Sequence, residues 1–201
     1  MRTFVSVEVP EDIRTKVGLF SDSLKDFFKN DVKWVLPKNL HFTIKFLGEI
    51  SESALSAVQE CVSNTAAEFG PFLMSLSNVG FFPSARNPRV IWIGTHEGAD
   101  KLLELFQELE SCLEHEGFDR DTRTFFPHLT IGRVRKYSKI IIPETLPDFE
   151  PVMYDVKGIV VIRSTLTPKG PVYERVFESD LNKSFKTDNQ EMMYRDILPN
   201  D

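Results

Sequence analysis

The chain has 201 residues, of which 41% are hydrophobic and 11% aromatic, and its formal net charge at pH 7 is −6. This is an ordinary globular composition, long enough for one substantial core or two small lobes. The negative charge argues against a protein that coats nucleic acid through charge alone, because that mode needs many phosphate contacts. The apolar runs are far shorter than the roughly 20 residues of a membrane span, and the N-terminal segment lacks the apolar block of a signal peptide. We therefore expect a cytoplasmic protein that does not contact a membrane.

Helical and strand-like periodicities alternate along the chain. In chain order we predict a strand within residues 1–9, a helix from Pro10, a strand over 40–47, a helix from Ser51, strands over 72–78 and 89–94, a helix over 98–117, and strands over 127–134, 152–163 and 172–177. Short, proline-rich connections favour antiparallel pairing, so we predict an α+β fold. We assign residues 1–180 to a single domain and residues 181–201, which turn polar and lose their period, to a C-terminal tail.

The two cysteines, Cys61 and Cys112, both fall at apolar positions of helical patterns. Neither lies in a C-x-x-C motif. A buried free cysteine behaves as a small apolar side chain, and disulfides are rare in cytoplasmic proteins. We therefore predict two buried thiols rather than a disulfide or a redox pair.

Two short stretches repeat each other: HFTI at residues 41–44 and HLTI at residues 128–131. Each places a threonine two residues after a histidine, with apolar residues in between. Alternate residues of a strand point to the same face, so the histidine and threonine of each copy would share one face and the apolar residues would enter a core. Either motif alone is typical of a strand histidine with local hydrogen bonds, but the pair indicates a site.

The paired motif suggests acid–base catalysis by His41 and His128, because imidazole has an unperturbed pKa of roughly 6.5 and both donates and accepts protons near neutrality. Thr43 and Thr130 would donate hydroxyl hydrogen bonds to a phosphoryl oxygen, and Arg133 would supply a fixed positive charge. Arg133 lies an odd number of residues after His128, so it reaches the same face only if the strand ends, bulges or twists near Gly132.

Other candidate residues have two interpretations each. Lys45 shares the face of the first histidine by strand alternation and would reach the same site. Phe4 and Phe46 would either stack on a base or, as we favour, pack in the core. His96 and His115 lie in a turn and a charged helix end, and we expect both to be solvated.

No metal or cofactor is indicated by the sequence. It has no H-E-x-x-H motif and no Cys/His cluster with ligand spacing, so a zinc site is poorly supported. It also lacks a P-loop and a G-x-G-x-x-G motif. The basic run over residues 133–139 would either guide an RNA end or protect a strand edge with charge.

Residues 40–49 and 127–133 resemble the two signatures of the two-histidine phosphoesterases, and are most similar to the RNA 2′,3′-cyclic phosphodiesterases called LigT-like. The resemblance extends over about residues 1 to 178. Further segments similar to family positions are residues 2–7, 80–83, 88–92, 163–166 and 170–173.

The resemblance implies a bilobal α+β fold, with two antiparallel sheets flanking a central groove, one His-x-Thr strand in each lobe and helices on the outer faces. It implies metal-free hydrolysis of a 2′,3′-cyclic phosphate, at an RNA 3′ end or on a nucleoside, to a 2′-phosphate by a cofactor-free enzyme, which we expect to be a monomer. By carry-over, His128 is the base and His41 the acid, while Thr43, Thr130 and Arg133 bind the phosphate. Two alternatives stay open: 2′,5′ joining of RNA ends, and a module that binds a nucleotide or RNA end without turnover.

Overall fold

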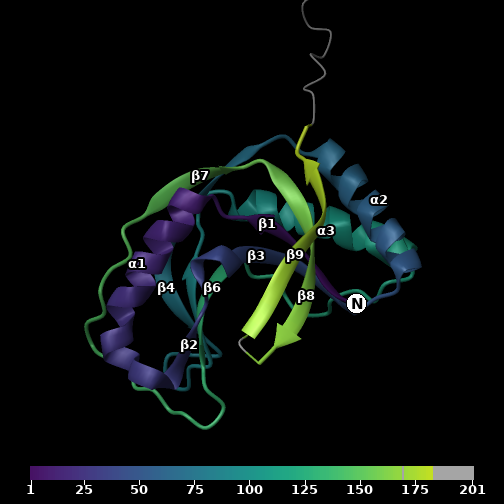
Figure 1. Cartoon of the computed structure of the whole chain (residues 1–201). Helices are drawn as coiled ribbons and strands as arrows, with labels where there is room; N and C mark the ends of the chain where they lie inside the picture. The colour runs from purple at the N-terminus through teal and green to yellow at the C-terminus, as the bar shows by residue number, and fades with distance from the viewer. Residues whose placement is uncertain (169, 183–201) are drawn as a thin grey trace, which may run out of the picture.

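The computed structural model describes residues 1–168 and 170–182 and places their strands in two sheets, in which all pairs of neighbouring strands are antiparallel (Figure 1). The first sheet has the order β3-β1-β8-β9, with β1 at Arg2–Glu8, β3 at His41–Glu49, β8 at Gly158–Thr167 and β9 at Gly170–Asp180. The second has the order β2-β6-β5-β4-β7, with β2 at Val32–Trp34, β4 at Phe72–Phe82, β5 at Val90–Gly94, β6 at His128–Val134 and β7 at Val152–Val156. The predicted α+β fold is confirmed.

Three α-helices cover the sheets within the described residues: α1 at Glu11–Phe28, α2 at Glu52–Glu68 and α3 at Ala99–His115. Short 3₁₀ turns at Lys29–Asp31 (η1) and Pro37–Asn39 (η2) flank β2. Helix α1 contacts β2 and β6, whereas α2 contacts β8 and β9, and α3 contacts β3. Figure 1 accordingly shows α1 on one side of the molecule and α2 with α3 on the other, with the strands between them.

Helix starts follow the sequence signals. Pro10 precedes α1, whose first turn carries Glu11 and Asp12, where acidic groups interact favourably with the helix dipole. The Ser51 hydroxyl accepts a hydrogen bond of 3.1 Å from the backbone N–H of Ala54, so it caps α2 at the predicted start of that helix. Buried apolar side chains of these helices join those of both sheets in one core.

The apolar residues of the two His-x-Thr motifs belong to this core. Phe42 and Ile44 are 1% and 3% exposed, and Leu129 and Ile131 are fully buried. Alternation then turns the histidines and threonines to the opposite face of each strand, and all four of these residues are half-buried. This confirms the predicted division between the core side and the site side of each motif.

The strands differ from the predictions most clearly in three places. Strand β4 continues to Phe82 instead of ending at Asn78, because Asn78 adopts a φ of 59° in a bulge that interrupts the pattern without ending the strand. The segment 152–163 is two strands in different sheets, separated at Lys157. The three-residue strand β2 is too short to carry a period and was not predicted.

The prediction of two free thiols is wrong. Cys61 in α2 and Cys112 in α3 form a disulfide, with their Cα atoms 5.6 Å apart. Both cysteines do lie at apolar positions of helical patterns, but α2 and α3 pack against each other and bring the two sulfur atoms together. The periodicity of one helix carries no information about which helix it will contact.

The C-terminal tail is only partly described. Leu181, the first residue assigned to it, is 3% exposed, and its backbone N–H donates to the Lys157 carbonyl, so the packed part of the chain includes this residue. The rest of the predicted tail, residues 183–201, lies outside the described residues. Among the described helices, none has the length and apolar character needed to cross a membrane.

Candidate active site

The two His-x-Thr strands come from different sheets and meet in the middle of the molecule. Strand β3 forms an edge of the first sheet, and β6 lies next to the short β2 at an edge of the second. Residues of β3 contact residues of β6, and Figure 1 shows the two strands adjacent between the helical layers. The structure therefore places both motifs in one region, although 87 positions separate their histidines, 41 and 128, in the sequence.

Both histidines make the same local hydrogen bond. The Nδ1 atom of His41 lies 2.7 Å from the carbonyl oxygen of Asn39, and that of His128 lies 2.7 Å from the carbonyl oxygen of Phe126. A carbonyl oxygen only accepts, so Nδ1 of each neutral ring carries the proton. Each Nε2 is left with a lone pair and can take up a proton.

Burial keeps both rings neutral. It lowers the pKa of His41 to about 4, against the opposing effect of its hydrogen bond to Asn39, and the positive charge of Arg133 lowers it further. The pKa of His128 is lowered in the same way: burial has the largest effect, the hydrogen bond to Phe126 opposes it, and the charge of Arg133 adds to the lowering. One cation, Arg133, thus acts on both histidines, although it belongs to β6.

A β-bulge brings Arg133 to this position. Thr130 pairs with Trp92 and Gly132 pairs with Ile91, so Ile131 is the extra residue on β6. Gly132 consequently turns to the buried side and Arg133 is exposed on the histidine side, which is the irregularity the sequence required. A Cβ atom on Gly132 would lie 2.8 Å from Val32 Cγ1, so close packing against β2 requires glycine here.

The same bulge occurs in β3 and overturns the expectation for Lys45. Ser6 pairs with Thr43 and Val5 pairs with Lys45, so Ile44 is the extra residue. Lys45 therefore points to the core side, where it is 6% exposed, forms an ion pair with Glu110 of α3 and donates a 2.7 Å hydrogen bond to the Asp119 carbonyl. It does not reach the site. Strand alternation failed here because one inserted residue reverses every later side chain.

Phe46 takes the place on β3 that Arg133 takes on β6. Each lies five residues after its motif histidine, and Phe46 is 58% exposed. Its core interpretation is therefore wrong, whereas that of Phe4 is confirmed, since Phe4 is 3% exposed and packs with Val160 and Ile162. One strand thus presents an exposed aromatic ring where the other presents a guanidinium.

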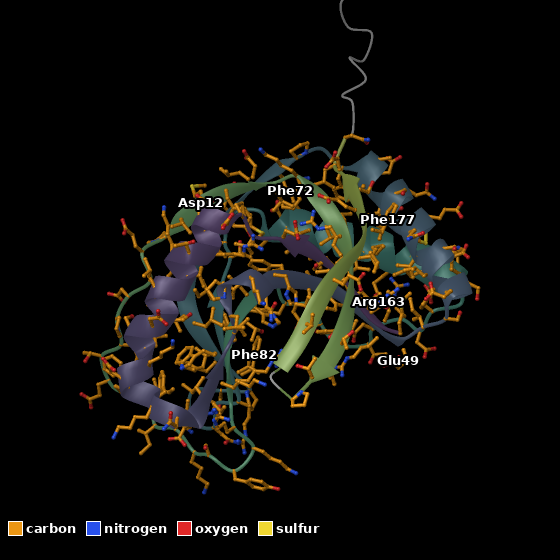
Figure 2. All side chains as sticks on the ribbon, in the orientation of Figure 1. Asp12, Glu49, Phe72, Phe82, Arg163 and Phe177 are labelled. Carbon is orange, nitrogen blue, oxygen red and sulfur yellow. A yellow bond between two sulfur atoms is a disulfide. The ribbon has the colours of Figure 1, made fainter. Side chains whose placement is uncertain are left out.

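Aromatic rings surround both histidines. His41 contacts Phe4 and Tyr173, with ring centroids 4.7 and 5.3 Å apart. His128 contacts three other rings edge-on or tilted, which are Phe82 at 5.0 Å, Trp92 at 6.4 Å and Phe126 at 6.4 Å. Phe82, labelled in Figure 2, is the last residue of β4. These contacts bury the two imidazole rings, and burial is the largest cause of their lowered pKa values.

Sequence reasoning gave no site role to Tyr173, Phe82, Trp92 or Phe126. The structure brings Tyr173 to His41, and Phe82 and Trp92 to His128, because β9, β4 and β5 lie in the same sheets as the motif strands. Phe126 contacts His128 because it lies two residues before it in the chain. For Tyr173, Phe82 and Trp92, only knowledge of the strand order would have indicated these contacts. The two remaining histidines, His96 and His115, are exposed, as predicted.

The described residues include no group of three or more His, Cys, Asp or Glu side chains that could hold a metal ion. The side chains that the two strands bring together offer two neutral imidazoles, two hydroxyls and one guanidinium. Such a set suits proton transfer to and from a phosphate ester.

Comparison with known proteins places this arrangement in a family. The sequence model described as LigT like Phosphoesterase matches the chain twice, over residues 7–92 and 93–173, so each match contains one His-x-Thr motif. Curated relatives named RNA 2′,3′-cyclic phosphodiesterase include one from Archaeoglobus fulgidus, 39% identical and aligned over 89% of this chain and 100% of the relative. Another, from Thermotoga maritima, is 35% identical over 89% of this chain and 94% of the relative.

Solved structures agree on the fold. A crystal structure of a protein from Thermus thermophilus superposes with a TM-score of 0.76 at 28% identity, covering 91% of this chain and 99% of that one. The crystal structure of E. coli LigT complexed with 3′-AMP has a TM-score of 0.73 at 23% identity, covering 90% and 98% of the two chains. The chain therefore belongs to the LigT like phosphoesterase family.

Proposed function

We propose that this enzyme is an RNA 2′,3′-cyclic phosphodiesterase that opens the terminal cyclic phosphate to a 2′-phosphate through two histidines. The observation that carries the proposal is the paired hydrogen bond from His41 and His128 Nδ1 to a carbonyl oxygen two residues earlier, which gives both rings the same tautomer. The activity named for the relatives from Archaeoglobus fulgidus and Thermotoga maritima supports it.

The reaction needs water to be activated on one side of the phosphorus and the leaving oxygen to be protonated on the other. In the proposed sequence, His128 Nε2 takes a proton from water while the water oxygen bonds to phosphorus. The bond between phosphorus and the 3′ oxygen breaks, and that oxygen takes a proton from His41 Nε2. The products are a 2′-phosphate and a free 3′ hydroxyl, and proton exchange with solvent restores both rings.

These reaction steps require His41 to carry an extra proton when substrate is bound. Burial lowers the pKa of His41 to about 4, so in the absence of a nearby anion the ring is neutral near pH 7. A bound phosphate anion favours the charged imidazolium and raises that pKa. Substrate binding and proton uptake by His41 are therefore coupled.

Three further side chains would hold the phosphate. The half-buried Thr43 and Thr130 lie on the histidine sides of their strands, and their hydroxyls would donate to phosphoryl oxygens. Arg133 lies close enough to both histidines to affect the pKa of each, and its charge would stabilise the negative charge that builds up in the transition state.

The site draws one motif from each sheet of the same chain, which supports a complete site in a monomer with residues 1–180 as one domain. An RNA substrate favours the cytoplasm as the location of the enzyme. The disulfide between Cys61 and Cys112 would be unusual in that compartment.

The test is hydrolysis of a short RNA that ends in a 2′,3′-cyclic phosphate, in excess chelator, with identification of the product. We expect a 2′-phosphate, formed despite the chelator and lost in His41→Ala. The matched control is His96→Ala, which removes an exposed histidine and should keep full activity. Binding of the RNA without turnover would favour a binding module, and a 3′-phosphate product would contradict the assigned leaving oxygen.

A further inference from the structure

A pocket of about 220 Å³ opens beside His41. Its lining includes His41 and Tyr173 of the candidate site and four charged residues, Glu8, Arg14, Lys38 and Arg175. A water molecule occupies about 30 Å³ in the liquid, so the pocket has room for several waters or for one small polar group. Apart from His41, its lining residues are not among those to which we assign the chemistry.

Two of the cations in this pocket form no ion pair within the described residues. Arg175 donates hydrogen bonds of 2.7 and 2.6 Å to both carboxylate oxygens of Glu8, and one of 2.5 Å to Glu178. Arg14 is half-buried and Lys38 is exposed, and no carboxylate in residues 1–168 or 170–182 forms an ion pair with either. The charges of Arg14 and Lys38 are therefore available to an anion next to His41.

The pocket on the other side of Arg14 has an acidic lining that does not favour an anion. A second pocket of about 290 Å³ shares Glu8 and Arg14 with the first. Its lining has four carboxylates, Glu8, Asp155, Glu178 and Asp180, and two cations, Arg14 and Lys157. The ion pairs of Arg175 with Glu8 and Glu178 offset part of this negative charge but leave an excess of carboxylates. A negatively charged group is thus favoured beside His41 and disfavoured one pocket further along.

We propose that the pocket with Arg14 and Lys38 is a subsite for the phosphodiester that precedes the terminal nucleotide of the RNA substrate. This proposal rests on the proposed function. A nucleoside 2′,3′-cyclic phosphate has no such phosphodiester, a dinucleotide has one, and each further nucleotide adds another that would meet the acidic pocket. The enzyme accordingly prefers RNA ends to mononucleotides, and its kcat/KM reaches the full value with a substrate of two nucleotides.

The experiment compares three substrates: adenosine 2′,3′-cyclic phosphate, and the dinucleotide and tetranucleotide of adenosine with the same cyclic end. The quantity measured is the ratio of kcat/KM for the dinucleotide to that for the mononucleotide. For the wild type we expect a ratio of at least about ten, since charge-assisted hydrogen bonds contribute a factor of this size each. The tetranucleotide should differ from the dinucleotide by less than about threefold, because the acidic pocket follows.

Arg14→Gln and Lys38→Gln should each lower the dinucleotide ratio several-fold, and the double variant should bring it close to one. Each lost cation should also reduce the salt dependence of the dinucleotide reaction, by about one in the slope of log kcat/KM against log salt. The control is Lys16→Gln, which removes an exposed cation from the same helix outside both pockets and should leave the ratio unchanged.

Two results would overturn the subsite while leaving the proposed function intact. One is equal kcat/KM for the three substrates in the wild type, and the other is a dinucleotide preference that survives in the double variant. Failure of the wild type to hydrolyse any of the three substrates would instead remove the proposed function, and the subsite with it. A kcat/KM much higher for the tetranucleotide than for the dinucleotide would contradict the inference that the acidic pocket disfavours a further phosphodiester.

Discussion

The two motif strands, β3 and β6, build the same local structure in different sheets but present different chemistry. In both, the histidine Nδ1 donates to the carbonyl two residues earlier, and in both the residue after the threonine is an extra, bulged one. After the bulge the strands diverge. On β3 a buried lysine precedes an exposed phenylalanine, and on β6 a buried glycine precedes an exposed arginine.

The shared part and the divergent part have different causes. The hydrogen bond and the bulge recur in two sheets with different neighbours, so they belong to the motif itself. The residues after the bulge, Phe46 and Arg133, are exposed on the site side, where a substrate with one charged and one aromatic part would meet them. In the proposed reaction, the shared part of the two strands would serve the proton transfers on both sides of phosphorus, and the divergent part would bind an asymmetric substrate.

The largest effect should come from either histidine. His41→Ala and His128→Ala should each reduce kcat by about 10² to 10⁴, the usual contribution of one general acid or base. The double variant should be little worse than either single one, because in the proposed reaction the two histidines act together on the same step. Steady-state hydrolysis of a cyclic-phosphate dinucleotide measures this, with circular dichroism to show that each variant folds. A variant that retains most of its activity would show that the two strands are not functionally equivalent.

The buried Lys45 should matter for stability. Lys45→Ala leaves Glu110 buried without its partner, and we expect the free energy of unfolding to fall by about 3–5 kcal/mol. The variant Lys45→Met/Glu110→Leu should recover most of this loss, because replacing both charges with apolar groups removes the unpaired charge. Denaturant unfolding measures both values. A double variant as unstable as Lys45→Ala would mean that the ion pair itself, and not the unpaired carboxylate, sets the cost.

Gly132 offers the matching test on β6, where β2 and not an ion pair fills the buried side of the bulge. Gly132→Ala would place its Cβ atom 2.8 Å from Val32 Cγ1 and 3.2 Å from a ring carbon of Trp34. We expect a loss of about 1–3 kcal/mol from overpacking, measured by denaturant unfolding. Unchanged stability would show that β2 moves away easily and does not fix the bulge.

Substitution of the exposed residue after each bulge should distinguish the effect of charge on the reaction from the effect of contact with the substrate. Arg133→Gln should lower kcat/KM by about 10- to 100-fold, the range for a lost charge-assisted hydrogen bond. Because the Arg133 cation lowers the pKa of His41 and of His128, its removal should raise both. Phe46→Leu keeps the charge, so we expect an effect of only a few-fold on kcat/KM and no change in either pKa.

The pH profile of kcat/KM measures those pKa values in the free enzyme. For the wild type both limbs should lie below pH 6.5, since burial lowers the pKa of each histidine and that of His41 to about 4. Activity should therefore decline as the pH rises above that range, where the acid has lost its proton. In Arg133→Gln the profile should move toward higher pH. A wild-type optimum above pH 7 would contradict the neutral, buried histidines.

Much of the fold and of the site could be predicted from the sequence because the signals are local. Alternation around Phe42 and Leu129 separated core from site, and the odd spacing of Arg133 required the strand to end, bulge or twist, of which the structure shows a bulge. Lys45 was misplaced because its spacing fitted simple alternation, so nothing indicated the matching bulge in β3. The disulfide partner of Cys61 depends on which helices pack together, which no periodicity encodes.

The smallest effect should come from Asn39, which differs from Phe126 in one respect. Both residues give a main-chain carbonyl to a histidine, but Asn39 also donates from its side chain, at 3.3 Å, to the Pro171 carbonyl of β9. Asn39→Ala should therefore cost about 1 kcal/mol of stability and change kcat/KM little, because the carbonyl that orients His41 remains. The pH profile separates the two contributions. A higher pKa of His41 in this variant would mean that the bond to β9, which holds Tyr173 against the imidazole, keeps water away from His41. An unchanged pKa would mean that residues of its own strand determine the protonation of His41.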